Sequence, residues 1–397
     1  MSLERYRSEI DELDDAIVRA LARRFAVCRD VAELKARTGT PMMQPQRVGA
    51  VKRRAAELGE RYGLERDLVE RMYDLLIQET CRLEDALIAE RRDGQPCAPV
   101  LVGGDHRSGT TLVSVILDSH PELVMGPELD FLEPTDLGPH LCECCRLLLA
   151  DDPRVRGAGV GARDPQYAAG VQLAKQSLRF GVPYDVLLEL AEAAMRRTGS
   201  DLRRFDERLV LIDAIGRYRA AATRKPRWGI KIQREIAQAG RFAAHWPGAR
   251  FVHVVRDGRD VAASHLRGGR PWGYRSIEEA ASGWAGVVDA AARTVAPDDI
   301  FELRYEDLVA DPPGALRPLF AFLGLGWDPR VLHHDGVEHS LFANPFEHPS
   351  ADAARRPIDA QAVGRHRRDL SDGDVAAFER LAGDALRRHG YAQAVRA

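Results

Sequence analysis

Long apolar runs are missing from this sequence. Nowhere do eighteen apolar residues follow one another, and a membrane-spanning helix needs about that number. The amino terminus is charged from Glu4 onward and has no apolar core of the signal-peptide type. We therefore expect a cytoplasmic protein that does not associate with a membrane.

Cysteine is also scarce, with six cysteines among 397 residues. Three of them crowd into Cys142–Cys145, close to His140, which does not look like a disulfide framework. A zinc site there is conceivable, but structural zinc sites use spacers of about two to four residues and usually a second cysteine pair. We expect reduced structural thiols and no metal.

Net charge is small as well, at −3, so no general attraction to nucleic acid or to acidic membranes is predicted. Any anion site must then be built locally. The remaining composition, 45% hydrophobic and 29% charged, is typical of a globular protein, and the length fits two domains.

The first part of the chain, residues 1–92, reads as an all-helical domain of three helices. Over residues 3–38 the apolar positions recur in steps of three and four, which predicts one long amphipathic helix. A glycine and Pro41 end it, and two further helices are expected over residues 45–62 and 65–92. Residues 93–98 carry glycine and proline and are interpreted as a linker.

The second part, residues 99–397, alternates short β-rich runs with helical stretches. Residues 100–103, 251–255 and 300–304 are the apolar runs. This alternation predicts an α/β domain whose central parallel sheet is covered on both faces. The stretch 138–227 is mostly helical and is interpreted as an insertion or lid.

A glycine-bearing loop follows the first of these strands and precedes a helix. Such a loop directs backbone N–H groups and the positive end of the helix at a bound phosphate. The spacing from Gly104 to Gly109 equals that of a Walker A loop, but Thr110 stands where that motif has lysine. A P-loop kinase, which would hydrolyse nucleotides with magnesium, is therefore disfavoured, and Arg107 supplies a cation from another loop position.

At this point the residues resemble a known family. The run Arg107–Leu112 is similar to the 5′-phosphosulfate loop of sulfotransferases, above all tyrosylprotein sulfotransferases and their bacterial relatives. A strand followed by Arg256, with Ser264 eight residues later, is similar to the element by which the family holds the 3′-phosphate. The segment Arg304–Leu308 is a third likeness, and the order of the three motifs makes the resemblance specific.

The resemblance implies a P-loop-like fold and 3′-phosphoadenosine-5′-phosphosulfate (PAPS) as sulfuryl donor, with 3′-phosphoadenosine-5′-phosphate (PAP) as product and no metal. Sulfuryl transfer passes through a loose in-line transition state, so positioning and cations should provide most of the catalysis. The residues expected to bind the donor are Arg107, Ser108, Gly109, Thr110, Thr111, Arg256 and Ser264. Ser340 and Arg356 fall in the region that resembles the family's donor-covering tail.

Two further residues are implied for the chemical step. Lys231 resembles the family lysine that stabilises the bridging oxygen, beside a catalytic role for Arg107. Glu128 falls where tyrosylprotein sulfotransferases place their catalytic base. His106, His120 and His265 are weaker alternatives for that base, and a solvated turn carboxylate is the structural alternative for Glu128.

The acceptor is expected to be a small molecule. The basic residues with which the family binds acidic peptides are not matched after Glu128, where Leu129–Phe131 stand. A structural alternative for the motif of Arg256 and Ser264 is that Arg256 only forms an ion pair with Asp257 or Asp260 on the protein surface.

Cations of the first domain are placed where they could bind a dianion. Arg24 and Lys35 are eleven residues apart and so share a face of a helix with about 100° per residue. Arg7 lies about 100° away from Arg24 and reaches the same pocket only across a dimer. This arrangement resembles the all-helical, type II chorismate mutases, which are intertwined dimers.

The resemblance implies a site for chorismate or a related dianion and a homodimer formed by the amino-terminal helices. The residues of that site would be Arg7, Arg24, Lys35, Arg47, Thr80 and Glu84. Arginines would bind the carboxylates and the lysine would stabilise the ether oxygen.

Departures from the mutase pattern leave alternatives open. Glu84 replaces the usual glutamine, so activity would require its protonated form and an acidic optimum. The pair Arg47–Val48 also resembles isochorismate-pyruvate lyases, which share the fold. The helices could also be a catalytically silent dimerisation module. The leading hypothesis is a bifunctional enzyme that joins a mutase-like domain to a sulfotransferase acting on a hydroxyl group.

Overall fold

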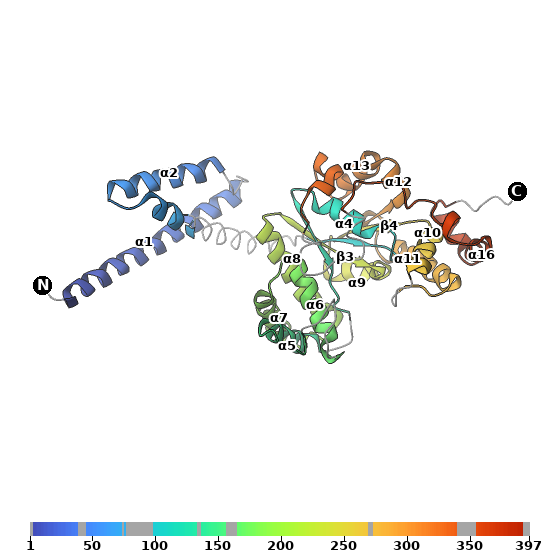
Figure 1. Cartoon of the computed structure of the whole chain (residues 1–397), viewed down its shortest axis with the longest axis horizontal. Helices are drawn as coiled ribbons and strands as arrows, with labels where there is room; N and C mark the ends of the chain where they lie inside the picture. The colour runs from blue at the N-terminus through green and yellow to red at the C-terminus, as the bar shows by residue number, and fades with distance from the viewer. Residues whose placement is uncertain are drawn as a thin grey trace. The chain divides into compact units, whose positions relative to one another are not determined.

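The computed structural model describes residues 3–38, 45–73, 75–76, 98–132, 136–155, 165–268, 273–339 and 355–391 (Figure 1). Contacts divide the chain into two compact units, Met1–Pro96 and Cys97–Ala397. Among the described helices, none is both long enough and apolar enough to cross a bilayer.

The first unit is helical. Helix α1 spans Leu3–Thr38 and α2 spans Pro45–Arg61, as the apolar periodicity predicts. Residues 66–73 and 75–76 are also helical, and the rest of the predicted third helix lies outside the described residues. Gly59 of α2 packs closely against Val69, because an added Cβ at Gly59 would come within 2.5 Å of Val69 Cγ2.

The second unit is built on a five-stranded sheet in the order β2-β3-β1-β4-β5, and every neighbouring pair is parallel. The strands are β1 (Val100–Gly103), β2 (Leu123–Glu128), β3 (Arg227–Gln233), β4 (Arg250–Val255) and β5 (Ile300–Arg304). The predicted central parallel sheet is therefore confirmed. Chain order reverses at β1, and ligands of open parallel sheets bind beyond the carboxyl ends of the strands at such a reversal.

Helices surround this sheet. They are α4 (Thr110–Asp118), α5 (Leu137–Leu149), α6 (Ala168–Arg179), α7 (Tyr184–Thr198), α8 (Phe205–Thr223), α9 (Ala239–His245), α10 (Gly258–Gly268), α11 (Ile277–Thr294), α12 (Tyr305–Ala310), α13 (Pro312–Phe322), α15 (His366–Asp369) and α16 (Asp372–Arg388). Short 3₁₀ turns are η1 (Pro165–Tyr167), η2 (Arg234–Gln238), η3 (Pro297–Asp299) and η4 (Pro329–Gly336).

Both faces of the sheet are covered, as expected of a parallel sheet. Val100 and Val102 pack into a core shared with α4 and α13, whereas Leu101 between them packs into a core shared with α5 to α9. A third core joins α10, α11 and α16 around Trp284 and Phe378.

The described parts of the stretch 138–227 are mostly helical, as predicted, but the interpretation of the stretch as an insertion or lid is corrected. Leu209 and Ile215 of α8 are fully buried in the same core as Leu101 and Ile230 of the sheet. Helices α5 to α8, drawn in green in Figure 1, thus form the layer that covers one face of the sheet.

Strand β2 is absent from the sequence prediction. It contains Gly126 and Pro127, residues that are rare inside strands. The strand lies at an edge of the sheet. The missing N–H group of its proline therefore removes no hydrogen bond to a second neighbouring strand. Strand β2 pairs with its neighbour β3, and this pairing places Glu128 opposite Lys231.

The cysteine-rich stretch lies on α5. Cys144 and Cys145 are completely buried, and burial raises the pKa of each thiol to about 12. No group of ligands able to hold a metal ion occurs among the described residues.

Candidate active site

The loop between β1 and α4 is shaped by close backbone approaches. Gly104 has a φ of 155°, and an added Cβ would lie 2.3 Å from the carbonyl oxygen of Val254. Gly109 has a φ of 100°, and a Cβ there would lie 2.6 Å from the Tyr305 ring. The two glycines therefore let the loop fold tightly over the carboxyl ends of β1 and β4.

The loop ends at the amino terminus of α4. The first N–H groups of this helix have no partner within the helix and point toward the space beyond the carboxyl ends of β1 and β4. Gly109 caps the helix and provides no side-chain acceptor for these groups. The Ser108 hydroxyl is buried and has no hydrogen-bond partner within the described part of the chain. The end of the helix thus offers several unsatisfied donors to an anion.

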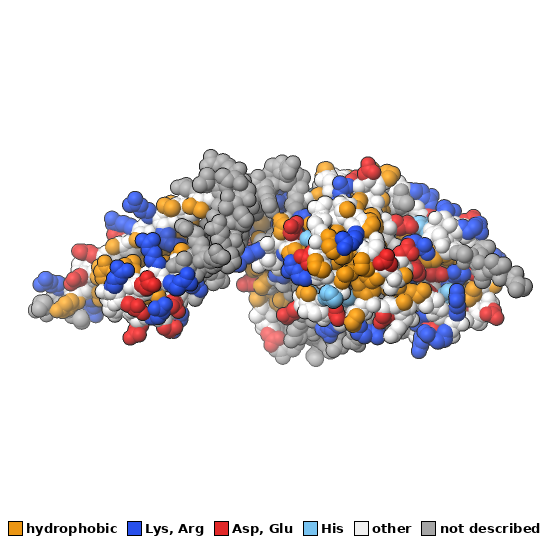
Figure 2. Space-filling model, turned by 90° about the horizontal axis from the view of Figure 1, so that it is seen from above, with side chains coloured by type: hydrophobic (Ala, Val, Ile, Leu, Met, Phe, Trp, Pro, Cys, Tyr) orange, Lys and Arg blue, Asp and Glu red, His pale blue; other side chains and the backbone are white. Residues whose placement is uncertain are grey.

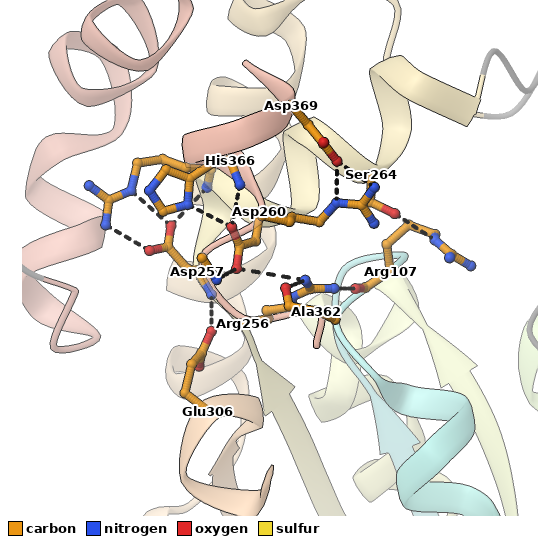
Figure 3. A network of polar contacts seen from close by, with 12 residues as sticks. Arg107, Arg256, Asp257, Asp260, Ser264, Glu306, Ala362, His366 and Asp369 are labelled. Atoms are coloured by element: carbon orange, nitrogen blue, oxygen red, sulfur yellow. Dashed lines mark hydrogen bonds and ion pairs between the residues drawn. The ribbon is translucent and has the colours of Figure 1, made fainter. Parts of the chain in front are cut away.

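Arg256 and Ser264 meet Arg107 of this loop, although they are far from it in the sequence (Figure 3). Arg107 Nε donates to Ser264 Oγ at 3.1 Å. Arg256 Nη1 donates to the carbonyl oxygen of Arg107 at 3.0 Å. The two motifs predicted to hold the ends of a nucleotide are therefore joined directly.

Arg256 pairs with Asp260, as the alternative interpretation expects, but it is buried and not on the surface. It is only 4% exposed, pairs with Asp260 at 3.6 Å, and lies 4.9 Å from the centre of the Tyr305 ring. Asp257 instead pairs with Arg259 at 2.7 Å. Arg256 Nε is buried without a partner among the described residues, so the guanidinium still has a donor to offer.

Asp260 ties the segment before α15 to this cluster. It accepts hydrogen bonds from His366 Nδ1 at 2.6 Å and from the Gly364 backbone at 2.7 Å. Burial opposes ionisation, but the His366 hydrogen bonds prevail and hold the pKa of Asp260 below its usual value. Arg256 also donates to the carbonyl oxygen of Ala362.

Of the two residues expected in the donor-covering tail, the structure describes Arg356. Arg356 is exposed, and no hydrogen bond or ion pair in the described structure joins it to the loop. Ser340 lies outside the described residues.

Lys231 supplies the cation that the loop lacks at Thr110. It is 2% exposed on β3, and its Nζ lies 3.5 Å from Thr111 Oγ1 and 3.7 Å from Glu128 Oε2. Burial lowers the pKa of Lys231, and the Glu128 carboxylate opposes that shift. Thr110 Oγ1 donates to Gln233 Oε1 at 3.1 Å, which fixes the loop against the end of β3.

Of the three alternative histidines, His120 and His265 have both ring nitrogens in hydrogen bonds. Burial lowers the pKa of His106 to about 3. His265 accepts from the Tyr274 backbone through Nδ1 at 3.3 Å, so its Nε2 donates to the carbonyl oxygen of His106, also at 3.3 Å. His120 bonds the Glu122 backbone and the Gly326 carbonyl through its two nitrogens. The Glu128 carboxylate, in contrast, is 39% exposed and lies next to Lys231.

The contacts that hold Asp105 of the loop, called the Asp105 brace, were not predicted from the sequence. Asp105 is completely buried and accepts from Arg234 Nε at 2.6 Å and from the Tyr274 hydroxyl at 2.9 Å. Burial raises the pKa of Tyr274, and the Asp105 charge adds to that effect. No local motif connects Asp105 with residues more than a hundred positions away, so only the fold reveals this contact.

The amino-terminal cations are only partly described. Arg7 is exposed on α1, and Arg24 is half-buried with Nη1 donating to the carbonyl oxygen of Leu76 at 3.4 Å. Lys35 and Arg47 lie on α1 and α2, but their side chains are not described. Thr80 and Glu84 lie outside the described residues.

Comparisons with known proteins give two family matches. The model of the sulfotransferase family matches residues 99–329, and that of chorismate mutase type II matches residues 6–85. A 4-amino-4-deoxychorismate mutase of Streptomyces venezuelae is 40% identical over 87 residues, which are 22% of this chain and 84% of that protein.

The second unit has more distant relatives. Protein-tyrosine sulfotransferase A of Caenorhabditis elegans is 22% identical over 298 residues, which cover 74% of this chain and 67% of that protein. The sulfotransferase domain of the Synechococcus PCC 7002 olefin synthase superposes with a TM-score of 0.48 and 20% identity, covering 73% of this chain and 94% of that domain.

Proposed function

Because the chain belongs to the sulfotransferase family, we propose that residues 99–397 transfer the sulfuryl group of PAPS to a hydroxyl group of a small-molecule acceptor. The observation that supports this most is the meeting of Arg107, Arg256 and Ser264 at the amino terminus of α4. Two anion-binding elements lie side by side there, as a nucleotide with phosphates at both ends requires.

The residues present fit the proposed donor. The Ser108 hydroxyl and Arg256 Nε are buried polar groups without partners in the described structure, and such groups are costly unless a ligand satisfies them. The loop amides, with Ser108, Thr110 and Thr111, would hold the 5′-phosphosulfate. Arg256 and Ser264 would hold the 3′-phosphate.

The chain's residues would act on the reaction as follows. The bound donor supplies an activated sulfuryl group, which passes to the acceptor oxygen as its bond to the 5′-phosphate oxygen breaks. Glu128 would take the proton of the acceptor hydroxyl. Lys231 would neutralise the charge that develops on the bridging oxygen, and its burial strengthens that interaction. Arg107 would stabilise the transferring group from the loop.

Binding of PAP tests the assignment of the donor site. We expect Arg256→Ala to weaken PAP binding by on the order of tenfold to a hundredfold, because a charge-assisted contact to phosphate is lost. Arg107→Ala should have a similar effect. Titration calorimetry measures both, with Arg196→Ala on the exposed side of α7 as the control. Unchanged affinity in both variants would contradict the assignment.

The first unit belongs to the chorismate mutase type II family, and we propose that it rearranges chorismate or an amino-substituted relative. The likeness to a 4-amino-4-deoxychorismate mutase supports the amino compound as one candidate. Chromatographic assays of both compounds across pH test this. Consumption of neither would favour the silent dimerisation module, and release of pyruvate from isochorismate would favour the lyase.

We also propose that the amino-terminal helices form a homodimer. Along α1, Ile10, Leu13 and Ile17 lie on one face and are more than half exposed, at 55%, 59% and 54%. Hydrophobic side chains are visible among the charged ones on the surface of this unit (Figure 2). An apolar stripe of this length on a single helix is unfavourable in water unless a second copy covers it.

A further inference from the structure

Glu235 occupies a fixed position directly after the strand that carries Lys231. Its neighbour Arg234 is held by Asp105 at 2.6 Å and lies 4.4 Å from the centre of the Tyr274 ring. On the other side Ile236 is completely buried against Gly103, where an added Cβ would come within 2.5 Å of it. Because both neighbours are held by the fold, the backbone position of Glu235 is fixed.

The Glu235 carboxyl group has no hydrogen-bond donor for its Oε2 atom, which is buried, anywhere in the described structure. Burial, together with the charges of Glu128 and Asp130, raises the pKa of Glu235 to about 7, although a hydrogen bond from its own backbone N–H and the charge of Arg234 oppose that shift. The group therefore lies within electrostatic reach of the proposed base and of a second carboxylate.

This arrangement is unfavourable for the protein alone. A buried carboxyl oxygen without a donor costs free energy, and nearby carboxylates add repulsion. Lys231 is already within 3.7 Å of Glu128, and Arg179 lies near enough to Lys231 to lower its pKa. Within the described structure Glu235 Oε2 has no hydrogen-bond partner, so a donor from a bound ligand would relieve the cost.

The geometry points to Glu235 as an acceptor-binding residue that recognises a basic nitrogen on the molecule to be sulfated. This inference rests on the proposed sulfotransferase function. An amino group would donate to Glu235 and compensate the charges of Asp130 and Glu128, whereas an anionic acceptor would be repelled. The absence of basic residues over Leu129–Phe131 agrees with this selection.

Matched phenols test the inference on the full chain saturated with PAP. Tyramine and 4-ethylphenol share the phenol and the two-carbon chain but differ in the amino group. We expect calorimetry to show that tyramine binds about tenfold more tightly, the effect of one charge-assisted hydrogen bond. Glu235→Gln should remove that difference. Glu189→Gln, which deletes an exposed carboxylate on α7, should preserve it.

Equal affinity for the two phenols, including no detectable binding of either, would overturn the inference. So would a Glu235→Gln variant that still prefers tyramine. The PAP titration that precedes each experiment reports on the proposed function separately. If PAP itself fails to bind, the sulfotransferase assignment fails first, whereas normal PAP binding with no preference between the phenols refutes only the role of Glu235.

Discussion

Lys231 on β3 and Glu128 on β2 face each other across two neighbouring parallel strands. The Lys231 side chain is buried, whereas the Glu128 side chain is open to the site. Lys231 Nζ also approaches Thr111, so a cation from β3 takes the place that a lysine fills within a Walker A loop. The positive charge next to the loop thus comes from Lys231 of the sheet and not from a lysine of the loop. That placement puts it between the helix terminus and the proposed base.

Replacement of the base should separate chemistry from donor binding. We expect Glu128→Gln to lower kcat by about a hundredfold to ten-thousandfold, because an amide cannot take the acceptor proton. PAP affinity should change little, since Glu128 belongs to the acceptor side. Initial rates and calorimetry measure the two quantities, and a fully active variant would remove Glu128 as base.

Burial of Lys231 predicts an alkaline limit on activity. In the proposed role the protonated lysine is the active form, and its pKa is lowered, so activity should be retained at lower pH and lost as pH rises through that pKa. The loss should begin below the ordinary lysine value of about 10.4. In Lys231→Arg any remaining activity should lack this limb, because arginine does not titrate there. An identical pH profile in both proteins would contradict the prediction.

At this scale the sequence predicts residues that belong to local motifs. The loop from Arg107 to Thr111, the pair Arg256 and Ser264, and Lys231 are recognisable because their spacing is fixed within one strand–helix unit. Glu235 and the Asp105 brace are not predictable in this way. Their roles depend on contacts between segments that only the folded sheet brings together.

Strand β1, its loop and α4 form the element on which the donor site depends. The loop passes so close to β4 and α12 that its two glycines have no room for a side chain. The alternation of strand and helix was predictable from the order of short β-rich runs and helical stretches along the chain. Strand β2 was not, because its Gly126 and Pro127 favour a turn until the edge position and pairing with β3 are known.

A pair of glycine variants tests how tightly this element is packed. Gly104→Ala should lower the free energy of unfolding by about 1–3 kcal/mol, since its Cβ meets the Val254 carbonyl at 2.3 Å and its φ is 155°. Gly286→Ala inside α11 has open space around it and should be neutral or stabilising by up to about 1 kcal/mol. Urea denaturation measures both. Equal stability would show that the loop can relax.

The whole molecule combines two families in one chain. The mutase family match ends at residue 85 and the sulfotransferase match begins at residue 99. If the first unit acts on an amino-substituted chorismate and Glu235 selects an amine, the two active sites would handle related compounds. Dimerisation through α1 would then hold two copies of each site together.

The dimer can be disrupted on one face of α1. Ile17→Glu should convert the full chain from a dimer to a monomer, because a charge would be placed in the apolar stripe of Ile10, Leu13 and Ile17. Glu12→Lys, about 100–160° around the helix from the residues of that stripe, should leave the dimer intact. Light scattering after size-exclusion chromatography measures the mass. A monomeric unsubstituted chain would refute the proposed dimer.

The central claim is that the loop after β1 and the pair Arg256 and Ser264 together bind the two ends of a sulfuryl-donor nucleotide. A crystal structure of the full chain with PAP measures this directly. The account predicts the 5′-phosphate on the backbone amides at the start of α4 and the 3′-phosphate within hydrogen-bonding distance of Arg256 and Ser264. A nucleotide bound elsewhere, or bound with only one phosphate at these residues, would contradict it.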